Sequence, residues 1–406
     1  MEKPEAIKAT EKKKRIPTSK FKRMTLDEVT RILGSTICKD DVNKVLTFLT
    51  MLSAYTDDSQ FNISFNAPSS TGKTYIPNEI AKLFPAEDVR ATGYCSPSAF
   101  FHEEGKWNKE TKTITQDLER KILIFLDQPH GGLLERLRPI LSHDKKELMI
   151  KITDKTEKAG LKTKTVIVRG YPSVIFCTAG LQTDEQEATR FLFLSPDLDQ
   201  EKIREAIELR IRKDSDVQVY QTWLDANPER QLLKERIEAI KQADIAHIRI
   251  PDTRRVKSLF FSGRRNLKPR HIRDIGRVMS IIKVIALLNL WFRKRKGKNI
   301  EANREDIKEA FKIWNSISEP QELNISPYVF EVYRKVLMPL WGENGTTGIP
   351  VRDMTNRYFQ VFKKEISRGE LYKQLIPAMV NAGLISTEQD PADRRKMVIF
   401  SPIKDK

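Results

Sequence analysis

The stretch that most constrains the fold is residues 62–74, which read N-I-S-F-N-A-P-S-S-T-G-K-T. Ile63 and Phe65 predict a short buried strand, and the run 78–84 behind the loop is compatible with a helix. Backbone amides of a small polar loop between a strand and a helix converge on phosphate oxygens, and the helix adds the positive end of its dipole. The sequence therefore predicts a phosphate-binding loop.

The loop supplies the groups that a bound nucleoside triphosphate needs. Lys73 would reach the β- and γ-phosphates, the Thr74 hydroxyl would ligate Mg²⁺, and Gly72 would let the backbone approach closely. Ala67 stands where the pattern G-x-x-x-x-G-K-[ST] has its first glycine, with the spacing kept, and a chance G-K-T in a lysine-rich chain is the alternative. The expected nucleotide-binding residues are Ala67, Pro68, Ser69, Ser70, Thr71, Gly72, Lys73 and Thr74.

A second apolar run, residues 121–128, reads K-I-L-I-F-L-D-Q. Such a continuous run predicts a strand buried on both faces, as in a parallel sheet. Asp127 at its end would lie beside the phosphate loop and hold Mg²⁺ with Thr74. A water-activating glutamate is expected next, but the chain has Gln128, whose amide can orient water and cannot take its proton. Glu135 is either a substitute base or a solvated helix residue.

Two alternating runs, 148–153 and 163–169, predict a long β-hairpin. Further buried strands are expected over 173–177 and over 190–194 (R-F-L-F-L). The hairpin has a basic tip, which would track a nucleic-acid backbone or else be a lysine-rich surface turn. Its candidate nucleic-acid contacts are Lys155, Lys158, Lys162 and Lys164.

The order of these parts resembles AAA+ helicases of the pre-sensor-1 hairpin group, and within it minichromosome-maintenance (MCM) helicases. K-A-G-L at 158–161 is similar to the K-A-G-I of their hairpin tip, S-V-I at 173–175 to their S-V-L, and T-R-F at 189–191 to the S-R-F that carries their arginine finger. The stretch 127–180 also resembles replication ATPases of plasmids, phages and cassette-type mobile elements. The resemblance covers roughly residues 40–320.

This resemblance implies further site residues. Arg190 would act as an arginine finger on ATP bound by the neighbouring subunit, unless it is a surface residue flanking a strand. Thr178, or alternatively Ala179, stands where the family has its sensor-1 asparagine. Arg270 and Arg277 match the R-x-x-x-x-x-x-R of the sensor-2 helix, with Arg270 the better candidate to touch the γ-phosphate. The expected catalytic residues are Lys73, Asp127, Gln128, Thr178, Arg190 and Arg270.

The formal net charge of +17 can reflect nucleic-acid binding, an acidic membrane surface or solubility. Because positive charge recurs along the whole chain, a long polyanion is favoured over a small acidic ligand. No run reaches the apolar length needed to span a bilayer, and we expect a cytoplasmic protein without a signal peptide. Cys38, Cys95 and Cys177 form no metal-ligand spacing with the histidines, so neither structural zinc nor a disulfide framework is expected.

The expected fold class is α/β: an AAA+ P-loop domain with a mostly parallel sheet, a helical lid and a C-terminal winged helix. Residues 1–24 are expected to be a basic tail, flexible or loosely docked, that acts as a nucleic-acid arm or is simply solvated. Residues 25–262 form the expected ATPase base domain, with the hairpin at about 147–170. The expected lid is 263–319 and the winged helix 326–402.

Within the lid, the basic cluster 293–298 is expected to end the helix that begins at Pro269, as the helix dipole favours. Residues 320–325 are expected to be a linker. The winged helix would bind DNA, or else serve protein contact or regulation. Its candidate DNA contacts in the wing are Arg394, Arg395 and Lys396.

The expected function is an ATP- and Mg²⁺-dependent DNA helicase or translocase that acts in replication, MCM-like and encoded by a mobile element. Identical subunits, six by resemblance, would surround single-stranded DNA, while the winged helix would bind duplex; no membrane partner is expected. A DNA-binding initiator or transposition regulator that does not unwind is the main alternative, and Gln128 supports it. A protein-remodelling ATPase would be expected to carry aromatic pore loops, whereas this chain offers lysines.

Overall fold

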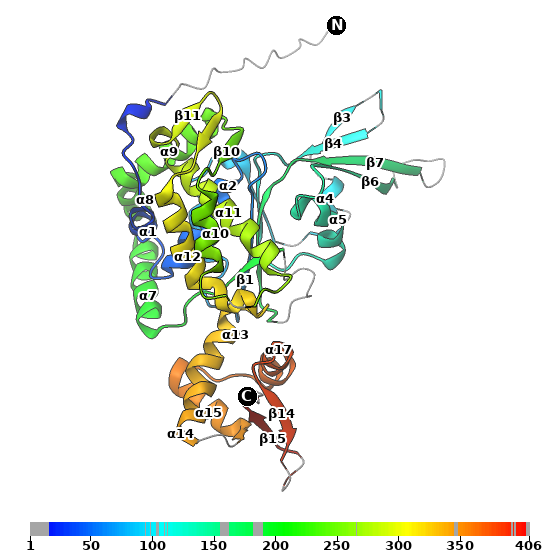
Figure 1. The fold of residues 1–406 in the computed structure, drawn as a ribbon, viewed down its shortest axis with the longest axis vertical. Coiled ribbons are helices and arrows are strands. Elements are labelled where there is room, and N and C mark those ends of the chain that lie inside the picture. The colour runs from blue at the N-terminus through cyan, green and yellow to red at the C-terminus, as the bar shows by residue number, and fades with distance from the viewer. Residues whose placement is uncertain are drawn as a thin grey trace.

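A five-stranded parallel sheet forms the centre of the molecule (Figure 1). The computed structural model describes residues 16–402 apart from 94, 98, 103–104, 109, 112, 155–161, 182–189, 265, 345–347, 391–392 and 394. The strands, in the spatial order β2-β5-β8-β1-β9, are β2 (Val89–Thr92), β5 (Ile122–Phe125), β8 (Ser173–Thr178), β1 (Asn62–Asn66) and β9 (Phe191–Leu194). Each neighbouring pair is parallel. The predicted α/β class with a mostly parallel sheet is therefore confirmed.

The strands are buried as their apolar sequences predict. Every residue of β1, β5, β8 and β9 is buried. Because β8 pairs with both β1 and β5, it separates the strand before the phosphate loop from the strand before Asp127. The segments that follow these three strands consequently meet at one end of the sheet, which we call the carboxyl end; the opposite end is the amino end.

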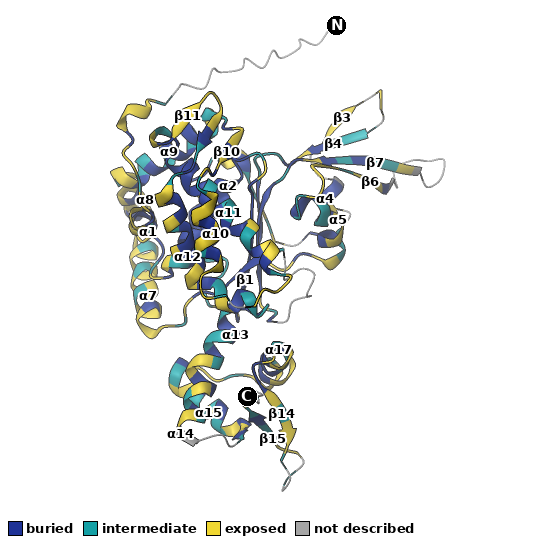
Figure 2. Cartoon of the chain, viewed as in Figure 1, coloured by how far each residue is buried: buried dark blue, intermediate teal, exposed yellow. Residues whose placement is uncertain are grey.

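Helices cover both faces of this sheet, and Figure 2 shows that the buried residues gather on the sheet and on the helix surfaces turned toward it. One face carries α1 (Leu26–Leu33), α2 (Asp41–Ser53), α3 (Tyr75–Ala81), α9 (Pro228–Ala243), α10 (Thr253–Phe261), α11 (His271–Leu288) and α12 (Arg304–Glu322). The other carries α4 (Ala99–His102) and α5 (Gly131–Leu141). Two further helices, α7 (Gln200–Ser215) and α8 (Val217–Asp225), lie at the rim.

The expected end of the long lid helix is wrong. Helix α11 ends at Leu288, and the basic cluster forms β11 (Lys294–Lys296), which pairs with β12 (Asn299–Glu301) in a small sheet that also contains β10 (His247–Arg249). The cause is a buried ion pair: the Arg293 guanidinium donates two hydrogen bonds of 2.5 and 2.7 Å to the Asp306 carboxylate of α12. This tertiary contact outweighs the helix-dipole preference.

The expected linker at 320–325 is wrong as well, since α12 continues through Pro320 to Glu322. The buried Gln321 side chain hydrogen-bonds both backbone groups of Phe193: it accepts from the amide at 3.0 Å and donates to the carbonyl at 2.8 Å. The Gln321 side chain thus makes, to the edge strand β9, the two hydrogen bonds that a neighbouring strand would otherwise make. This contact stabilises the helical conformation of the chain beyond Pro320.

The C-terminal end of the predicted tail packs against the folded part of the chain. Residues 1–15 lie outside the described residues. The Phe21 ring is buried, with its centroid 4.5 Å from that of Trp291 and 5.0 Å from the guanidinium carbon of Arg236. The backbone of Met24 exchanges two hydrogen bonds of 2.8 Å with the Asn289 side chain. From Phe21 onward, therefore, the segment packs on the helical layer.

A separate four-stranded sheet projects from the molecule and is called the arm (Figure 1). It consists of β3 (Lys106–Asn108), β4 (Thr113–Asp117), β7 (Lys162–Arg169) and β6 (Glu147–Asp154), in that order. The predicted long hairpin is confirmed by the antiparallel pairing of β6 with β7. Its tip at 155–161, with Lys155 and Lys158, and the side chain of Lys162 lie outside the described residues.

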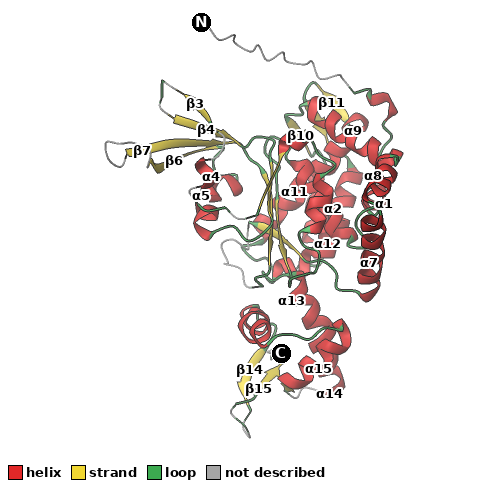
Figure 3. Cartoon of the chain, turned by 180° about the vertical axis from the view of Figure 1, so that it is seen from behind, coloured by secondary structure: helices red, strands yellow, loops and turns green. Residues whose placement is uncertain are grey.

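The C-terminal unit lies next to the carboxyl end of the sheet, beneath it in Figure 3, and has its own hydrophobic core. Three helical stretches form it: α13 (Pro327–Val332) continuing to α14 (Met338–Asn344), α15 (Val351–Phe362), and α16 (Arg368–Glu370) continuing to α17 (Ile376–Asn381). Strands β13 (Ile349–Pro350), β15 (Met397–Phe400) and β14 (Ser386–Gln389) complete it as a small sheet.

Candidate nucleotide-binding site

The predicted phosphate loop lies between β1 and α3 at the carboxyl end of the sheet. Gly72 has φ of +91°, and a Cβ there would meet no atom within 4 Å, so glycine is required by backbone conformation and not by crowding. Ala67 is buried, and its amide donates to the Thr178 carbonyl at 3.3 Å. The methyl group at this departure from the motif is thus packed in the core. The helix begins at Tyr75, earlier than the run 78–84 indicated.

Lys73 lies within the loop in a partly buried position. Its ammonium donates to the Pro68 carbonyl at 3.3 Å, and its carbonyl accepts from the Cys177 thiol at 3.2 Å. Burial raises the pKa of that thiol to about 12, so it stays protonated and keeps donating at neutral pH. Burial also lowers the pKa of the Lys73 ammonium, the charge of Asp127 opposes this, and the charge of Lys364 lowers it further.

A chain of hydrogen bonds joins the ends of β5 and β8. The Gly180 amide donates to the Thr178 hydroxyl at 2.9 Å, and that hydroxyl donates to the Gln128 side-chain oxygen, also at 2.9 Å. The backbone amide of Gln128 donates to the Asp127 carboxylate at 2.8 Å. Thr178, rather than Ala179, makes the contact, and the exposed Glu135 on α5 takes no part in it. The structure thus brings Lys73, Asp127, Gln128 and Thr178 to one end of the sheet.

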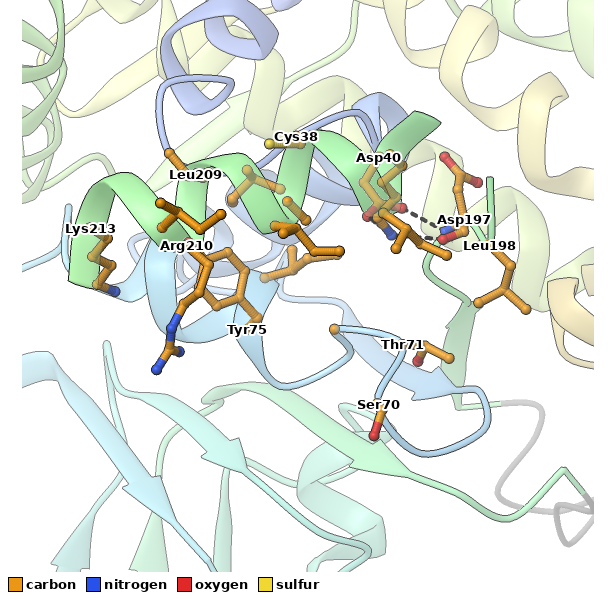
Figure 4. Close-up of a pocket in the computed structure, with 18 residues that line it drawn as sticks. Cys38, Asp40, Ser70, Thr71, Tyr75, Asp197, Leu198, Leu209, Arg210 and Lys213 are labelled. Carbon is orange, nitrogen blue, oxygen red and sulfur yellow. Dashed lines mark hydrogen bonds and ion pairs between the residues drawn. The ribbon is translucent and has the colours of Figure 1, made fainter. Parts of the chain in front are cut away.

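Next to the loop is a cavity of about 430 Å³, drawn in Figure 4. Ser70, Thr71 and Gly72 form its phosphate-loop side, and apolar side chains of α7, among them Ile203 and Ile207, form much of the rest. The volume lies in the range of small-ligand pockets.

Sequence reasoning missed this cavity, because the charged segment that became α7 was assigned no chemistry. An apolar stripe at i, i+4 and i+8 on this mostly charged helix, formed by Ile203, Ile207 and Ile211, predicted a connecting helix but was not interpreted as the wall of a pocket. These side chains are 41%, 55% and 64% exposed, which is unusual for three isoleucines in a row on one helix face.

A second cavity, of about 490 Å³, lies at the amino end of the sheet and is basic. Arg190, Arg273, Arg277 and Lys283 line it together with Asn62, the first residue of β1. Arg190 donates from Nε to the Ser142 hydroxyl at 2.8 Å. Arg277 donates to the Phe191 carbonyl at 3.0 Å. Burial lowers the pKa of Arg277 to about 10, so it remains charged at neutral pH.

Arg190 consequently lies far from the predicted phosphate loop of the same chain. Asn62 and Phe191 are paired at the amino end of the sheet, whereas the loop begins after Asn66 at the other end. Five strand residues span about 13 Å from first to last Cα. The predicted phosphate loop and Arg190 therefore lie at opposite ends of the sheet.

The Arg270 side chain is held by contacts within the chain. Its Nε donates to Asp274 at 3.1 Å, another of its nitrogens bonds Asn324, and its side chain is 9% exposed. It lines neither of the two cavities.

The arm combines an exposed aromatic ring with basic groups. Trp107 of β3 is 50% exposed, and the Lys164 ammonium of β7 lies 5.5 Å from its ring centroid. In the C-terminal wing, the exposed Arg395 and Lys396 lie near Asp393, at 3.1 and 3.5 Å. Arg394 lies outside the described residues.

Within the described part of the chain, no helix is both long and apolar enough to cross a bilayer. No group of three or more His, Cys, Asp or Glu residues there could hold a metal ion, and the three cysteines are free thiols.

No protein-family model and no curated protein matches the sequence. Among solved structures, the chain is similar to the crystal structure of a full-length MCM homolog from Methanopyrus kandleri, with 11% sequence identity and a TM-score of 0.43. The match covers 72% of this chain and 58% of that one, so the chain corresponds to less than two thirds of that protein. Function therefore has to follow from the site itself.

Proposed function

We propose that the protein is an ATP-dependent DNA helicase or translocase, MCM-like and acting in replication, that works as a ring of identical subunits, six by analogy. The observation that carries this proposal is the convergence of Lys73, Asp127, Gln128 and Thr178 from separate parallel strands. Such a set holds phosphates on one side and a water molecule on the other, as phosphoryl transfer to water requires.

The donor groups fit ATP with Mg²⁺. Lys73 would bind the β- and γ-phosphates, and the Thr74 hydroxyl and Asp127 carboxylate are the oxygen ligands that Mg²⁺ prefers. When bound, the ion would neutralise phosphate charge. Gln128, held by Thr178, would orient the attacking water without accepting its proton.

Arg190 would complete the site of a neighbouring subunit. It cannot reach its own phosphate loop, because the sheet separates the two. In a head-to-tail arrangement, the basic cavity of one subunit would face the nucleotide of the next, and such a heterologous interface forms a ring when the rotation between neighbours closes. Arg270 would contribute to the same interface only if it exchanged Asp274 and Asn324 for a phosphate.

The arm and the C-terminal unit would contact DNA. Lysines and an exposed tryptophan suit single-stranded DNA, which is held by backbone charge and by stacking without sequence readout. The C-terminal helices and hairpin, with Arg395 and Lys396, would bind duplex as a winged helix. A homo-oligomeric ring carrying these arms inward would pull one strand through its centre.

Replacing Trp107 with alanine is expected to weaken single-stranded DNA binding by about 5- to 100-fold, the range of one lost base–aromatic stack. Titration of a labelled oligothymidine at fixed salt, followed by fluorescence anisotropy, measures this. Trp107→Phe should keep most of the affinity, and Phe261→Ala, which removes a ring of similar exposure on α10, should keep all of it. Equal DNA affinities of Trp107→Ala and the wild-type protein would contradict the proposed role of the arm in DNA binding.

A strand-displacement assay with and without ATP tests the proposed function as a whole. The wild-type protein should bind ATP and separate strands only when ATP is present, and Lys73→Ala should lose nucleotide binding, turnover and unwinding together. Normal turnover by Lys73→Ala would refute the site. ATP binding and turnover without unwinding would instead identify a DNA-binding initiator or transposition regulator. Gln128 favours this second candidate, because a site without a general base at this position suits a slow ATPase.

A further inference from the structure

The C-terminal unit is docked on the end of the sheet that carries the candidate nucleotide site. The Tyr328 amide of α13 donates to the Ser195 hydroxyl at 3.0 Å, and that hydroxyl donates to the Asn66 carbonyl at 2.6 Å. In a second contact, the Leu181 amide donates to the side-chain oxygen of Gln374 at 3.1 Å. The C-terminal unit is thus bonded both to the end of β1 and to the turn that follows β8.

Apolar packing fixes both partners of the second contact. Leu181 is buried in the hydrophobic core of the C-terminal unit, although it follows β8 of the central sheet. Leu371 and Leu375, on either side of Gln374, are buried in the same core. Because a backbone amide can only donate, the half-buried Gln374 side chain has to present its oxygen, and not its nitrogen, to Leu181.

The turn after β8 also supports the predicted water-orienting group. Leu181 directly follows Gly180, whose amide donates to the Thr178 hydroxyl at 2.9 Å. That hydroxyl donates to the Gln128 side-chain oxygen, also at 2.9 Å. The Gly180 carbonyl accepts from the Asn66 side chain at 3.2 Å. Gly180 therefore lies between the two contacts of the C-terminal unit and the residues at the end of β5.

The position of this turn decides where the Thr178 proton points. A threonine hydroxyl rotates freely unless its lone pairs are engaged, and the bond that it accepts from Gly180 leaves its proton directed at Gln128. A neutral amide acts on water only by orientation, since it cannot take a proton. A misplacement of about 1 Å can cost on the order of 10²-fold in rate. A group that fixes the turn therefore bears on hydrolysis.

We propose that Gln374 is a positioning residue for ATP hydrolysis: its side-chain oxygen holds the turn after β8, so that Thr178 keeps Gln128 oriented toward the attacking water. The inference rests on the proposed ATPase function and adds a group from outside the domain of the central sheet. Because this chain of bonds ends at Gln128 and not at the phosphate loop, its loss slows hydrolysis and leaves ATP affinity unchanged. The position of the C-terminal unit is thereby coupled to hydrolysis in the same subunit.

Steady-state turnover of the full-length protein, measured as phosphate release over a range of ATP concentrations, tests this role. Gln374→Leu keeps much of the side-chain shape and removes the acceptor oxygen. It is expected to lower kcat by about 2- to 12-fold, the net worth of one hydrogen bond, with KM unchanged. Gln374→Glu still offers an oxygen to the Leu181 amide and should restore most of kcat.

Two further variants separate this role from a purely structural one. Gln360→Leu removes the same amide group from an exposed position on α15, and it should keep the wild-type kcat. In a Thr178→Val protein the chain of bonds is already broken, so Gln374→Leu should cause little further loss. The same loss in both backgrounds, or wild-type kcat in Gln374→Leu, overturns this inference and leaves the proposed function intact. Failure of the wild-type protein to hydrolyse ATP overturns both.

Discussion

Arg190→Ala is expected to lower the ATP turnover of the assembled protein by about 10³-fold, the lower end of what a trans arginine contributes to phosphoryl transfer. ATP affinity should hardly change, since Arg190 lies at the opposite end of the sheet from its own phosphate loop. Phosphate release measures the turnover, and titration with a fluorescent ATP analogue measures the affinity. Arg190→Lys should lose nearly as much turnover, because an ammonium cannot replace the planar fork of a guanidinium.

Mixing two inactive variants separates this role from a structural one. Arg190→Ala subunits keep the loop residue Lys73, and Lys73→Ala subunits keep Arg190. In a random one-to-one mixture of a head-to-tail ring, about one interface in four pairs an intact loop with an intact arginine. Turnover should therefore reappear on mixing. A mixture as inactive as its components would contradict action in trans, and would make the Arg190–Ser142 bond the main role of this side chain.

The sequence predicted those parts that depend on local pattern. The strands at Ile122–Phe125 and Ser173–Thr178 were expected because they contain continuous apolar runs, as in a sheet covered on both faces, and the strand at Asn62–Asn66 because Ile63 and Phe65 directly precede the loop. Parallel pairing then places their carboxyl ends together by geometry alone. Lys73, Asp127, Gln128 and Thr178 could be brought to one site on this basis, without any knowledge of distances.

The parts that sequence reasoning missed depend on contacts between distant residues. Nothing near Arg293 shows that Asp306 will bury its charge and turn a helix end into a strand. Nothing near Gln321 shows that its side chain will pair with Phe193. The docking of Gln374 on Leu181 joins residues that lie 193 positions apart. Local propensity is a weak guide wherever such a contact decides the conformation.

The identity of residue 128 leads to the second large effect. Gln128→Glu places a carboxylate where the amide is held, and the Thr178 hydroxyl can donate to either group, so the geometry is retained. General-base catalysis contributes about 10²- to 10⁴-fold in enzymes that have it. We expect turnover to rise by about tenfold to a hundredfold, because only part of that gain is realised in a site not shaped for a base.

The pH profile and a second substitution show whether this gain arises at the water position. A glutamate with an ordinary pKa near 4.3 is a base only when ionised, so turnover of Gln128→Glu should fall below about pH 5, while the wild-type rate should lack this step. Thr178→Val removes the hydroxyl and keeps the shape, and it should abolish most of the gain, because the carboxylate is then no longer oriented. Complete loss of turnover in Gln128→Glu would contradict the placement of residue 128 at the water. A gain that survives Thr178→Val would instead show that the carboxylate at position 128 acts as a base without the hydrogen bond from Thr178. Hydrolysis by the wild-type protein would then be limited by the inability of the Gln128 side-chain amide to accept a proton, and not by its orientation.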